Sequence, residues 1–289
     1  MKIVVLAKQV PDTWSDRKIN LETGMLDREA SEPVPDEINE RALEVALQFR
    51  DANPDAEIVA LSMGLEDTTK TLRKLLSMGA DSAVLVTGAA LAGSDMVQTS
   101  RVLAAAVQRI APDLLVAGNE ATDGRGGMVP AMVAEILGWP VLPSLDEVTI
   151  TAEGVSGTTQ VDGGSLSLSS GLPAAISVTE KSAEARFPNF KGIMQAKKKP
   201  METWSLAELG IQAGPDAAPV RSVMVSAQAR PPRGRAEEVE QEPHGVGFAF
   251  AGSNEKRRAS FNVGSMDVSS CLKKKTAGFR VTISGSDVK

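Results

Sequence analysis

Short apolar runs alternate with helix-like segments along the first 120 residues of the chain. The runs rich in Val, Leu, Ile and Ala are residues 2–7, 57–64, 82–87 and 113–119. The segments between them repeat apolar residues at helical spacing and are residues 36–50, 65–80 and 93–110. Strands that are separated by helices are joined by crossover connections, which link parallel neighbours. We therefore expect an α/β fold with a mostly parallel, twisted sheet and helices on both of its faces.

Two of the expected helices have a capping residue at their start. Asp36 opens the segment 36–50, with Asn39 three residues later, and Ser94 lies at the start of 93–110. Short side chains with an oxygen atom accept hydrogen bonds from the free amides of a first helical turn. We expect Asp36 and Ser94 to be N-caps, and capping alone would explain Asp36.

The composition fits such a sheet and argues against several kinds of site. Hydrophobic residues make up 42% of the chain but aromatic residues only 3%, and Tyr is absent, so aliphatic side chains must form the core. Buried parallel strands have this composition. Cys271 and His244 are the only residues of their types. A disulfide, a Cys/His zinc site and a Ser-His-Asp triad are therefore not expected.

Charge is distributed unevenly along the chain, whose net charge is −6. Residues 230–289 carry 11 basic and 7 acidic side chains, which leaves 20 basic and 30 acidic side chains on residues 1–229. An acidic main body argues against nucleic acid as a partner. No apolar run has the length of a membrane span, and the run at residues 2–7 is short for a signal peptide. We expect a cytoplasmic protein that is not embedded in a membrane.

The length and composition of the apolar runs change after Gly138. Shorter runs with Gly and Ser follow, at residues 147–155, 158–170 and 172–180. Alternation of apolar and polar residues in the second run is typical of a strand with one wet face. We expect these three runs to form an antiparallel extension of the first domain. From about residue 208 onward Gly, Pro, Ala and charged residues dominate, which predicts a weakly ordered linker and tail.

A glycine-rich turn at the end of the fourth run is the sharpest local feature. Within residues 116–138, glycines stand at 118, 124, 126 and 127, and a helix is expected to begin near Met128 to Pro130. Glycines let a ligand approach the backbone, and free amides at a helix start attract anions. The spacing fits neither a Walker A loop nor G-x-G-x-x-G. A nucleotide site and a tight turn without a ligand both remain open.

Other candidate residues lie at strand ends. Lys8 could meet a phosphate or a flavin, with a solvated lysine as the favoured alternative, and Trp14 could stack on a ligand ring, with a half-buried loop residue favoured. Glu120 and Asp123 could form an acid/base pair, but no nucleophile accompanies them, which favours two surface carboxylates. No catalytic set is found, so a bound cofactor would have to supply any chemistry.

Residues 186–200, RFPNFKGIMQAKKKP, place two Phe residues and an Ile-Met pair directly before three lysines. A stretch bounded by Pro and Gly is hardly core. The aromatic residues could dock on a partner, or pack in a small cluster under the loop. The lysines could steer an acidic partner, or simply form a solvated run.

Taken together, these segments resemble the electron transfer flavoprotein beta subunit family. The segments that carry the resemblance are KQVPDT at 8–13, DEINERALEVAL at 36–47, LSMGAD at 76–81, GNEATDG at 118–124, the strands within 161–178, and residues 186–200. The resemblance implies a Rossmann-like fold of the adenine nucleotide alpha hydrolase-like type. It also implies a heterodimer with a larger alpha subunit, one FAD shared between the subunits, and an AMP held by the beta subunit.

In such a protein the beta subunit is an electron carrier and not an enzyme. Electrons would come from acyl-CoA and other flavoprotein dehydrogenases, as in fatty acid beta-oxidation, and pass to an electron transfer flavoprotein quinone oxidoreductase in the membrane. A bifurcating relative, with a second FAD and NADH as reactant, is the alternative. An adenine-nucleotide-dependent enzyme on the same type of sheet is a remote one.

The resemblance also implies site residues. The positions that match the AMP site are Leu6, Ala7, Asp36, Glu37, Ile38, Asn39, Met63, Gly118, Asn119, Glu120, Ala121, Thr122, Asp123, Gly124, Arg125, Gly126, Gly127, Met128 and Val129. The flavin would lie near Thr13 and Ile38, although Thr13 replaces an aromatic residue of some relatives. The partner recognition loop would be residues 184–200, with Phe190 as the anchor. Its other contact residues would be Phe187, Ile193, Met194, Lys197, Lys198 and Lys199.

The domain boundaries follow from the same comparison of segments. We expect residues 1–207 to form a nucleotide-binding α/β domain that includes the recognition loop at 184–200, and residues 208–289 to form a C-terminal linker and tail. The segments RPPR at 230–233 and KTAGFRV at 275–281 look like two halves of one family segment, separated by an atypical insert at 234–275. Association with the alpha subunit through this tail is therefore in doubt.

Overall fold

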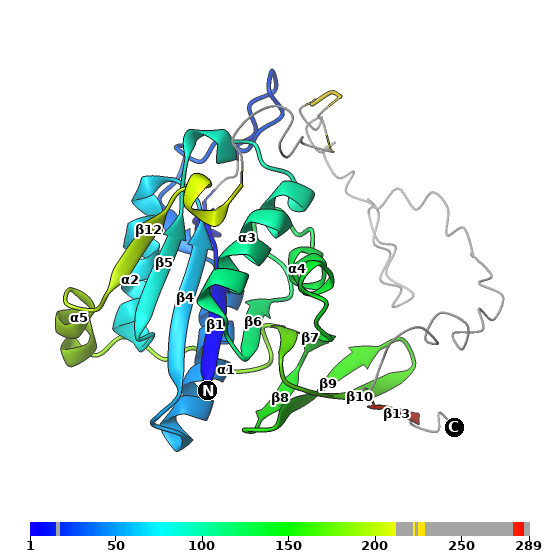
Figure 1. Ribbon diagram of the computed structural model, residues 1–289. Coiled ribbons are helices and arrows are strands. Elements are labelled where there is room, and N and C mark those ends of the chain that lie inside the picture. The colour runs from blue at the N-terminus through cyan, green and yellow to red at the C-terminus, as the bar shows by residue number, and fades with distance from the viewer. Residues whose placement is uncertain (16–17, 212–221, 223–224, 229–279, 286–289) are drawn as a thin grey trace, which may run out of the picture.

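A seven-stranded parallel sheet forms the centre of the molecule (Figure 1). The computed structural model describes residues 1–15, 18–211, 222, 225–228 and 280–285. In order across the sheet, its strands are β12 (Met201–Trp204), β5 (Ser82–Val86), β4 (Glu57–Met63), β1 (Lys2–Ala7), β6 (Leu114–Gly118), β11 (Ala174–Val178) and β7 (Val141–Leu145). Every neighbouring pair is parallel. The expected α/β fold class is confirmed.

Four helices cover the two faces of this sheet. Helices α1 (Glu37–Ala52) and α2 (Thr69–Met78) pack on one face, and α3 (Met96–Ile110) and α4 (Val129–Leu137) pack on the other. Side chains along β1 alternate between them: Ile3 and Val5 face α1 and α2, whereas Val4 and Leu6 face α3 and α4. Both faces of the strands are thus buried, which is why the strands read as continuous apolar runs.

The start of one helix differs from the prediction. Asp36 caps α1 as expected, because its carboxylate accepts a hydrogen bond from the amide of Ile38. The N-cap of α3 is Asp95 and not Ser94. The carboxylate of Asp95 accepts from the amide of Gln98, whereas the hydroxyl of Ser94 donates to the carbonyl of Leu91 in the preceding turn. The Ser94 prediction was wrong because Ser94 and Asp95 are adjacent and both residue types are good N-caps. The preceding turn takes the Ser94 hydroxyl, and Asp95 caps the helix.

A second, antiparallel sheet extends the domain, as expected. Its strands are, in order, β13 (Arg280–Gly285), β10 (Gly164–Gly171), β9 (Gly154–Val161) and β8 (Glu147–Ile150). The run at 172–180 was assigned to this extension, and that assignment was wrong. Strand β11 returns to the main sheet and lies between β6 and β7, with all five of its residues buried.

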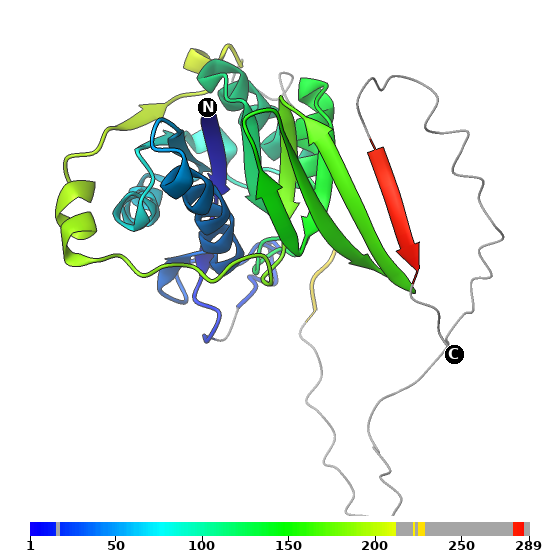
Figure 2. The same cartoon turned by 90° about the horizontal axis from the view of Figure 1, so that it is seen from below.

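Two short strands, one short helix and three 3₁₀ turns complete the described chain. Strands β2 (Gln9–Pro11) and β3 (Pro33–Pro35) pair and enclose a long loop, and α5 (Phe190–Ala196) precedes β12. Single 3₁₀ turns are η1 (Glu66–Thr68), η2 (Ala89–Leu91) and η3 (Ala207–Leu209). Helix α5 and the second sheet lie at opposite ends of the main sheet (Figures 1 and 2).

Part of the expected tail is structured. Residues 280–285 form β13, which pairs with β10 at the edge of the second sheet. The proposed insert at 234–275 lies outside the described residues. Among the helices of the described chain, none is both long and apolar enough to cross a membrane.

Candidate functional site at the carboxyl edge of the sheet

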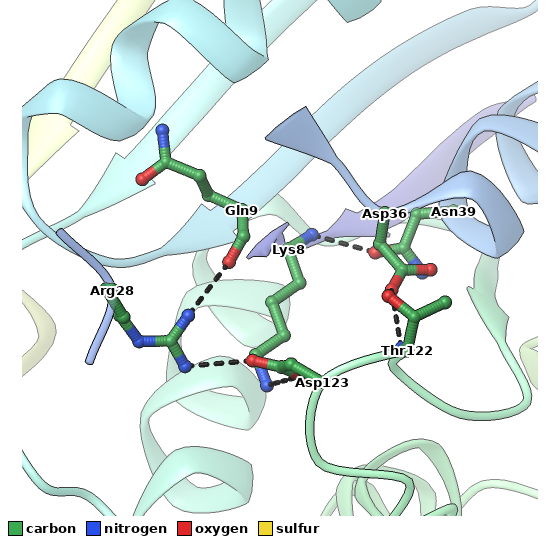
Figure 3. A network of polar contacts seen from close by, with 7 residues as sticks. All are labelled: Lys8, Gln9, Arg28, Asp36, Asn39, Thr122 and Asp123. Carbon is green, nitrogen blue, oxygen red and sulfur yellow. Dashed lines mark hydrogen bonds and ion pairs between the residues drawn. The ribbon is translucent and has the colours of Figure 1, made fainter. Parts of the chain in front are cut away.

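The loop that joins β6 to α4, residues 119–128, lies at the carboxyl edge of the parallel sheet, where ligands bind in open α/β folds. Strands β1 and β4 end beside it. Three segments distant in sequence meet here: the residues after β1, the start of α1 and the loop itself (Figure 3).

Asp36 fixes this loop to the first helix. Its side chain is fully buried, and one carboxylate oxygen accepts from the amide of Ile38 at 3.0 Å. The other oxygen accepts from the amide of Thr122 at 2.7 Å and from the Thr122 hydroxyl at 2.8 Å. Both oxygens are therefore occupied by the protein's own donors, so Asp36 positions the loop.

Asn39 and Gly118 bring β1, β6 and α1 into close contact. The side-chain oxygen of Asn39 accepts from the amide of Lys8 at 2.8 Å. A Cβ atom on Gly118 would lie 2.7 Å from the Asn39 amide nitrogen and 2.9 Å from the Ile38 side chain. Glycine is thus required at 118 for close packing of the helix against the strand, which is a structural reason for one glycine of the predicted motif.

Asp123 is the second anchor of the loop. Its side chain is only 2% exposed and accepts from Lys8 Nζ at 2.7 Å and from Arg28 Nη2 at 2.9 Å. Arg28 also donates to the carbonyl of Gln9 at 3.3 Å. The prediction of a surface carboxylate at 123 was therefore wrong, because the Asp123 side chain is buried. Lys8 keeps 42% of its side chain exposed while it pairs with Asp123 (Figure 3).

The two cations determine the charge of Asp123. Burial raises the pKa of this carboxyl, but attraction by Lys8 and hydrogen bonds from Lys8 and Arg28 outweigh the burial. The pKa of Asp123 therefore lies below its ordinary value. The carboxylate stays ionised at neutral pH, so it is a structural anion here.

Replacing Asp123 with asparagine should cost about 1–2 kcal/mol of stability at pH 7, a value reduced because Lys8 and Arg28 are half exposed to solvent. A lowered folded-state pKa means that the contribution is complete above the unfolded pKa of about 4 and is lost as pH falls through the lower folded value. Urea unfolding from pH 7 to pH 3 should show the wild type and Asp123→Asn converging below pH 4.

A matched control for this prediction is Glu57→Gln, because Glu57 pairs with Lys2 at the surface at 3.4 Å. That variant should change stability by less than about 0.5 kcal/mol. A difference between wild type and Asp123→Asn that stays constant across the whole pH range would contradict the assignment.

Beyond Asp123 the loop exposes its backbone. Residues 124–128 are exposed, and Arg125 and Gly127 have positive φ values of 48° and 62°. No backbone carbonyl of the described chain accepts from the amides of Gly126, Gly127 or Met128. Helix α4 follows immediately, and the free amides of its first turn attract an anion such as a phosphate.

Apolar and polar groups near this backbone fit the rest of a nucleotide. Leu6 and Met63 lie at the ends of β1 and β4, on the face covered by α3 and α4. The side-chain oxygen of Asn119 is buried and has no hydrogen-bond partner among the described residues. A buried acceptor without a partner is costly unless a ligand or water donates to it. The residues present therefore fit an adenylate, with apolar contacts, one orphan acceptor and exposed amides.

A different surface is formed by α5 and the residues before it. Asn189 caps this helix by accepting from the amide of Gly192 at 2.7 Å. Phe187 is 92% exposed and Phe190 is 81% exposed. The alternative of an aromatic cluster packed under a loop is wrong for both side chains, and the expected loop contains a helix.

The outer face of α5 is apolar and solvent-exposed. Phe190, Ile193 and Met194 have helical i, i+3, i+4 spacing and are all exposed, whereas Ala196 is buried on the inner side. Lys197 and Lys198 are exposed, but Lys199 is partly buried and donates to backbone carbonyls at the end of α2. The interpretation of all three lysines as one solvated run is wrong for Lys199.

The chain is similar to known proteins over most of its length. The family model described as the electron transfer flavoprotein domain matches residues 23–209. The electron transfer flavoprotein subunit beta of Mycobacterium tuberculosis is 45% identical over 249 residues, which cover 84% of this chain and 94% of the relative. The corresponding Mycobacterium leprae protein is 48% identical over 73% of this chain and 81% of its own length. The chain belongs to the electron transfer flavoprotein beta subunit family.

A more distant relative of this electron transfer flavoprotein beta subunit comes from a different kind of complex. The caffeyl-CoA reductase-Etf complex subunit CarD of Acetobacterium woodii is 34% identical over 214 residues, which cover 73% of this chain and 81% of the relative.

Among the residues described here, no group of three or more His, Cys, Asp and Glu side chains could hold a metal ion.

The structure brings most of the site positions expected for an electron transfer flavoprotein beta subunit to one edge, but in different roles. Ala7 faces the α1 and α2 side of the sheet, opposite to Leu6. Glu37 is exposed and accepts from the hydroxyl of Thr13 at 3.0 Å. Trp14 is 93% exposed, so the expectation of a half-buried loop residue was wrong.

Sequence reasoning missed Arg28 in this beta subunit. Arg28 belongs to the loop between β2 and β3, and its partner Asp123 is 95 residues away. No spacing signal links the two residues, since the pairing depends on how the loop folds back over the sheet. Lys8 was considered only as a ligand contact or a solvated side chain, because its carboxylate partner is equally remote in sequence.

Proposed function

We propose that this beta subunit forms a heterodimer with an electron transfer flavoprotein alpha subunit and shares one FAD with it. In the proposal this cytoplasmic protein receives electrons from acyl-CoA and other flavoprotein dehydrogenases. It passes them to a membrane quinone oxidoreductase and so to the respiratory chain. An electron transfer role and pairing with an alpha subunit are properties of the family. The flavin supplies the redox chemistry when it is bound, so the chain itself turns nothing over.

The observation that carries this proposal is the nucleotide-compatible edge of the sheet. The amides of Gly126, Gly127 and Met128, from which no backbone carbonyl of the described residues accepts, and the start of α4 would hold the phosphate of an AMP. Asn119 would supply an acceptor, and Leu6 and Met63 would supply apolar contacts. Asp36 and Asp123 support this site from beneath by fixing the loop.

The second support is the exposed apolar face of α5. A large exposed aromatic side chain such as Phe190 is what a transient partner contact requires, because its burial occurs only in the complex. Lys197 and Lys198 stand next to this face and would attract an acidic partner surface. We assign the docking of the dehydrogenase to this region.

The nucleotide content of the purified protein tests the proposal. The chain is co-purified with its alpha partner, the complex is denatured, and the released nucleotides are identified by chromatography and mass spectrometry. One FAD and one AMP per heterodimer is the expected result. A complex that releases no adenylate, or a chain that is purified without flavin and without a partner, would overturn it.

A bifurcating electron transfer flavoprotein is the second candidate, motivated by the likeness to the Acetobacterium protein of a caffeyl-CoA reductase complex. In that case the beta site would hold a second FAD in place of AMP, and NADH would reduce the complex. The same measurement separates the two candidates, since two FAD and no AMP would be released. ATP turnover by the purified chain would instead indicate an adenine-nucleotide-dependent enzyme.

A further inference from the structure

Two cationic side chains hold helix α5 against α2. Each comes from one of the two segments and donates hydrogen bonds to backbone carbonyls at the end of the other. Arg73 of α2 donates to the carbonyl of Ala196 at 2.6 Å and to the carbonyl of Lys199 at 3.1 Å. In return, Lys199 Nζ donates to three carbonyls at the end of α2. These belong to Leu76 at 3.1 Å, Gly79 at 3.3 Å and Ala80 at 2.6 Å.

This reciprocal capping satisfies groups that a helix end leaves unpaired. The last carbonyls of a helix lack an internal donor, and a cation close to them is favourable. Lys199 is partly buried among them, and burial lowers its pKa from the ordinary value, against the attraction of Asp81. The ammonium is therefore a structural donor that connects two elements, unlike its neighbours in the lysine run.

A glycine permits the close approach of the two helices. A Cβ atom on Gly192 would overlap the carbonyl oxygen of Ser77 in α2. That oxygen belongs to the backbone, so it cannot move aside as a flexible side chain would. An alanine at 192 would therefore force α5 away from α2.

The chain is also fixed on both sides of α5. Before the helix, Arg186 forms a bidentate ion pair with Glu44 at 2.7 and 2.9 Å and contacts Asp51 at 2.7 Å. After the helix, Pro200 accepts from the amide of Ala83, and β12 joins the edge of the main sheet. The exposed face of α5 is thus presented by a segment whose two ends are fixed. The helix itself lies beside α2, at the β12 end of the main sheet (Figure 1).

We propose that Arg73, Lys199 and Gly192 are positioning residues that hold α5 in one orientation, so that its apolar face is ready to dock on the partner dehydrogenase. The docking role of α5 in this inference rests on the proposed function. A surface that is ordered before contact loses less conformational entropy on binding. If detachment from α2 left α5 correctly placed one tenth of the time, the apparent dissociation constant would rise about tenfold.

The test measures order and docking separately in the co-purified two-subunit protein. Amide hydrogen exchange followed by mass spectrometry reports on residues 190–196. Steady-state electron transfer from an acyl-CoA dehydrogenase of the same organism, reduced with octanoyl-CoA, gives the apparent KM and the maximal rate. The variants are Lys199→Gln, Arg73→Gln and Gly192→Ala.

Lys199→Gln and Gly192→Ala each have a matched control. Lys198→Gln removes the same charge one residue earlier, on an exposed side chain. It is a control for amide exchange alone, because Lys198 belongs to the proposed docking surface. Gln195→Ala adds a helix-favouring alanine on an exposed position of α5. The three test variants should raise amide exchange in α5 and raise the apparent KM about tenfold, with an unchanged maximal rate. The controls should leave exchange unchanged.

Unchanged exchange in Lys199→Gln and Gly192→Ala would overturn the inference. So would faster exchange with an unchanged KM, provided that Phe190→Ala does raise the KM in the same assay. If Phe190→Ala also leaves the KM unchanged, the docking role of α5 fails and the proposed partner contact falls with it. Native circular dichroism and retained flavin in each variant confirm that only the α5 region was altered.

Discussion

Replacing Asp36 with alanine is expected to lower the free energy of unfolding by about 3 kcal/mol, the largest stability effect among the site residues. Removal of an N-cap costs about 1 kcal/mol. Removal of Asp36 also removes the carboxylate oxygen that accepts from the amide and the hydroxyl of Thr122, which adds the cost of two lost hydrogen bonds. Because Thr122 belongs to the glycine-rich loop, the variant should also be purified with less bound AMP.

Asp95→Ala is the comparison, because Asp95 is also an aspartate N-cap, at the start of α3, and its second oxygen accepts from the amide of the exposed residue Ser222. It should cost only about 1 kcal/mol. Urea unfolding and nucleotide analysis of both variants would check this. Equal stability losses in the two variants would show that the link from Asp36 to Thr122 contributes nothing.

Phe190→Ala is expected to weaken docking of the dehydrogenase by about 1.5–3 kcal/mol, which is roughly a tenfold to hundredfold rise in the apparent KM. The side chain is exposed in the free protein and its ring is the largest group on the outer face of α5. Its removal costs the free protein little, because almost none of the ring is buried there. The folded stability and the nucleotide content should therefore stay at the wild-type level.

The measurement is electron transfer from a substrate-reduced acyl-CoA dehydrogenase at several dehydrogenase concentrations. Trp14→Ala is a useful comparison, since Trp14 is an equally exposed aromatic residue in the loop between β2 and β3. That variant should leave the dehydrogenase KM unchanged. A wild-type KM in Phe190→Ala would reject the docking role of this residue.

The parts of the fold that could be predicted from sequence are those fixed by local patterns. Strands β1, β4, β5 and β6 and helices α1 to α3 follow from apolar periodicity, since each buries a continuous surface. The position of β11 did not follow. Its run of five buried residues is compatible with either sheet, and only the pairing with β6 and β7 decides between them.

The candidate site shows the same division. The Asp36 cap and the glycine-rich loop are local signals, and both could be read from sequence. The contacts that hold the loop are not local: Asp36 with Thr122, Asp123 with Arg28, and Asp123 with Lys8 each join distant segments. Likewise, three adjacent lysines look equivalent in sequence, and only the carbonyls at the end of α2 distinguish Lys199.

The placement of β11 has a consequence for synthesis of the chain. Strand β7 leaves the ribosome before β11, yet β11 is its parallel partner and also the second neighbour of β6. Until residues 174–178 emerge, the nascent chain carries an open edge on β6 and a β7 without its parallel partner. Such edges recruit other chains. The segments of β9 and β10, which pair as an antiparallel hairpin, are both synthesised in this interval.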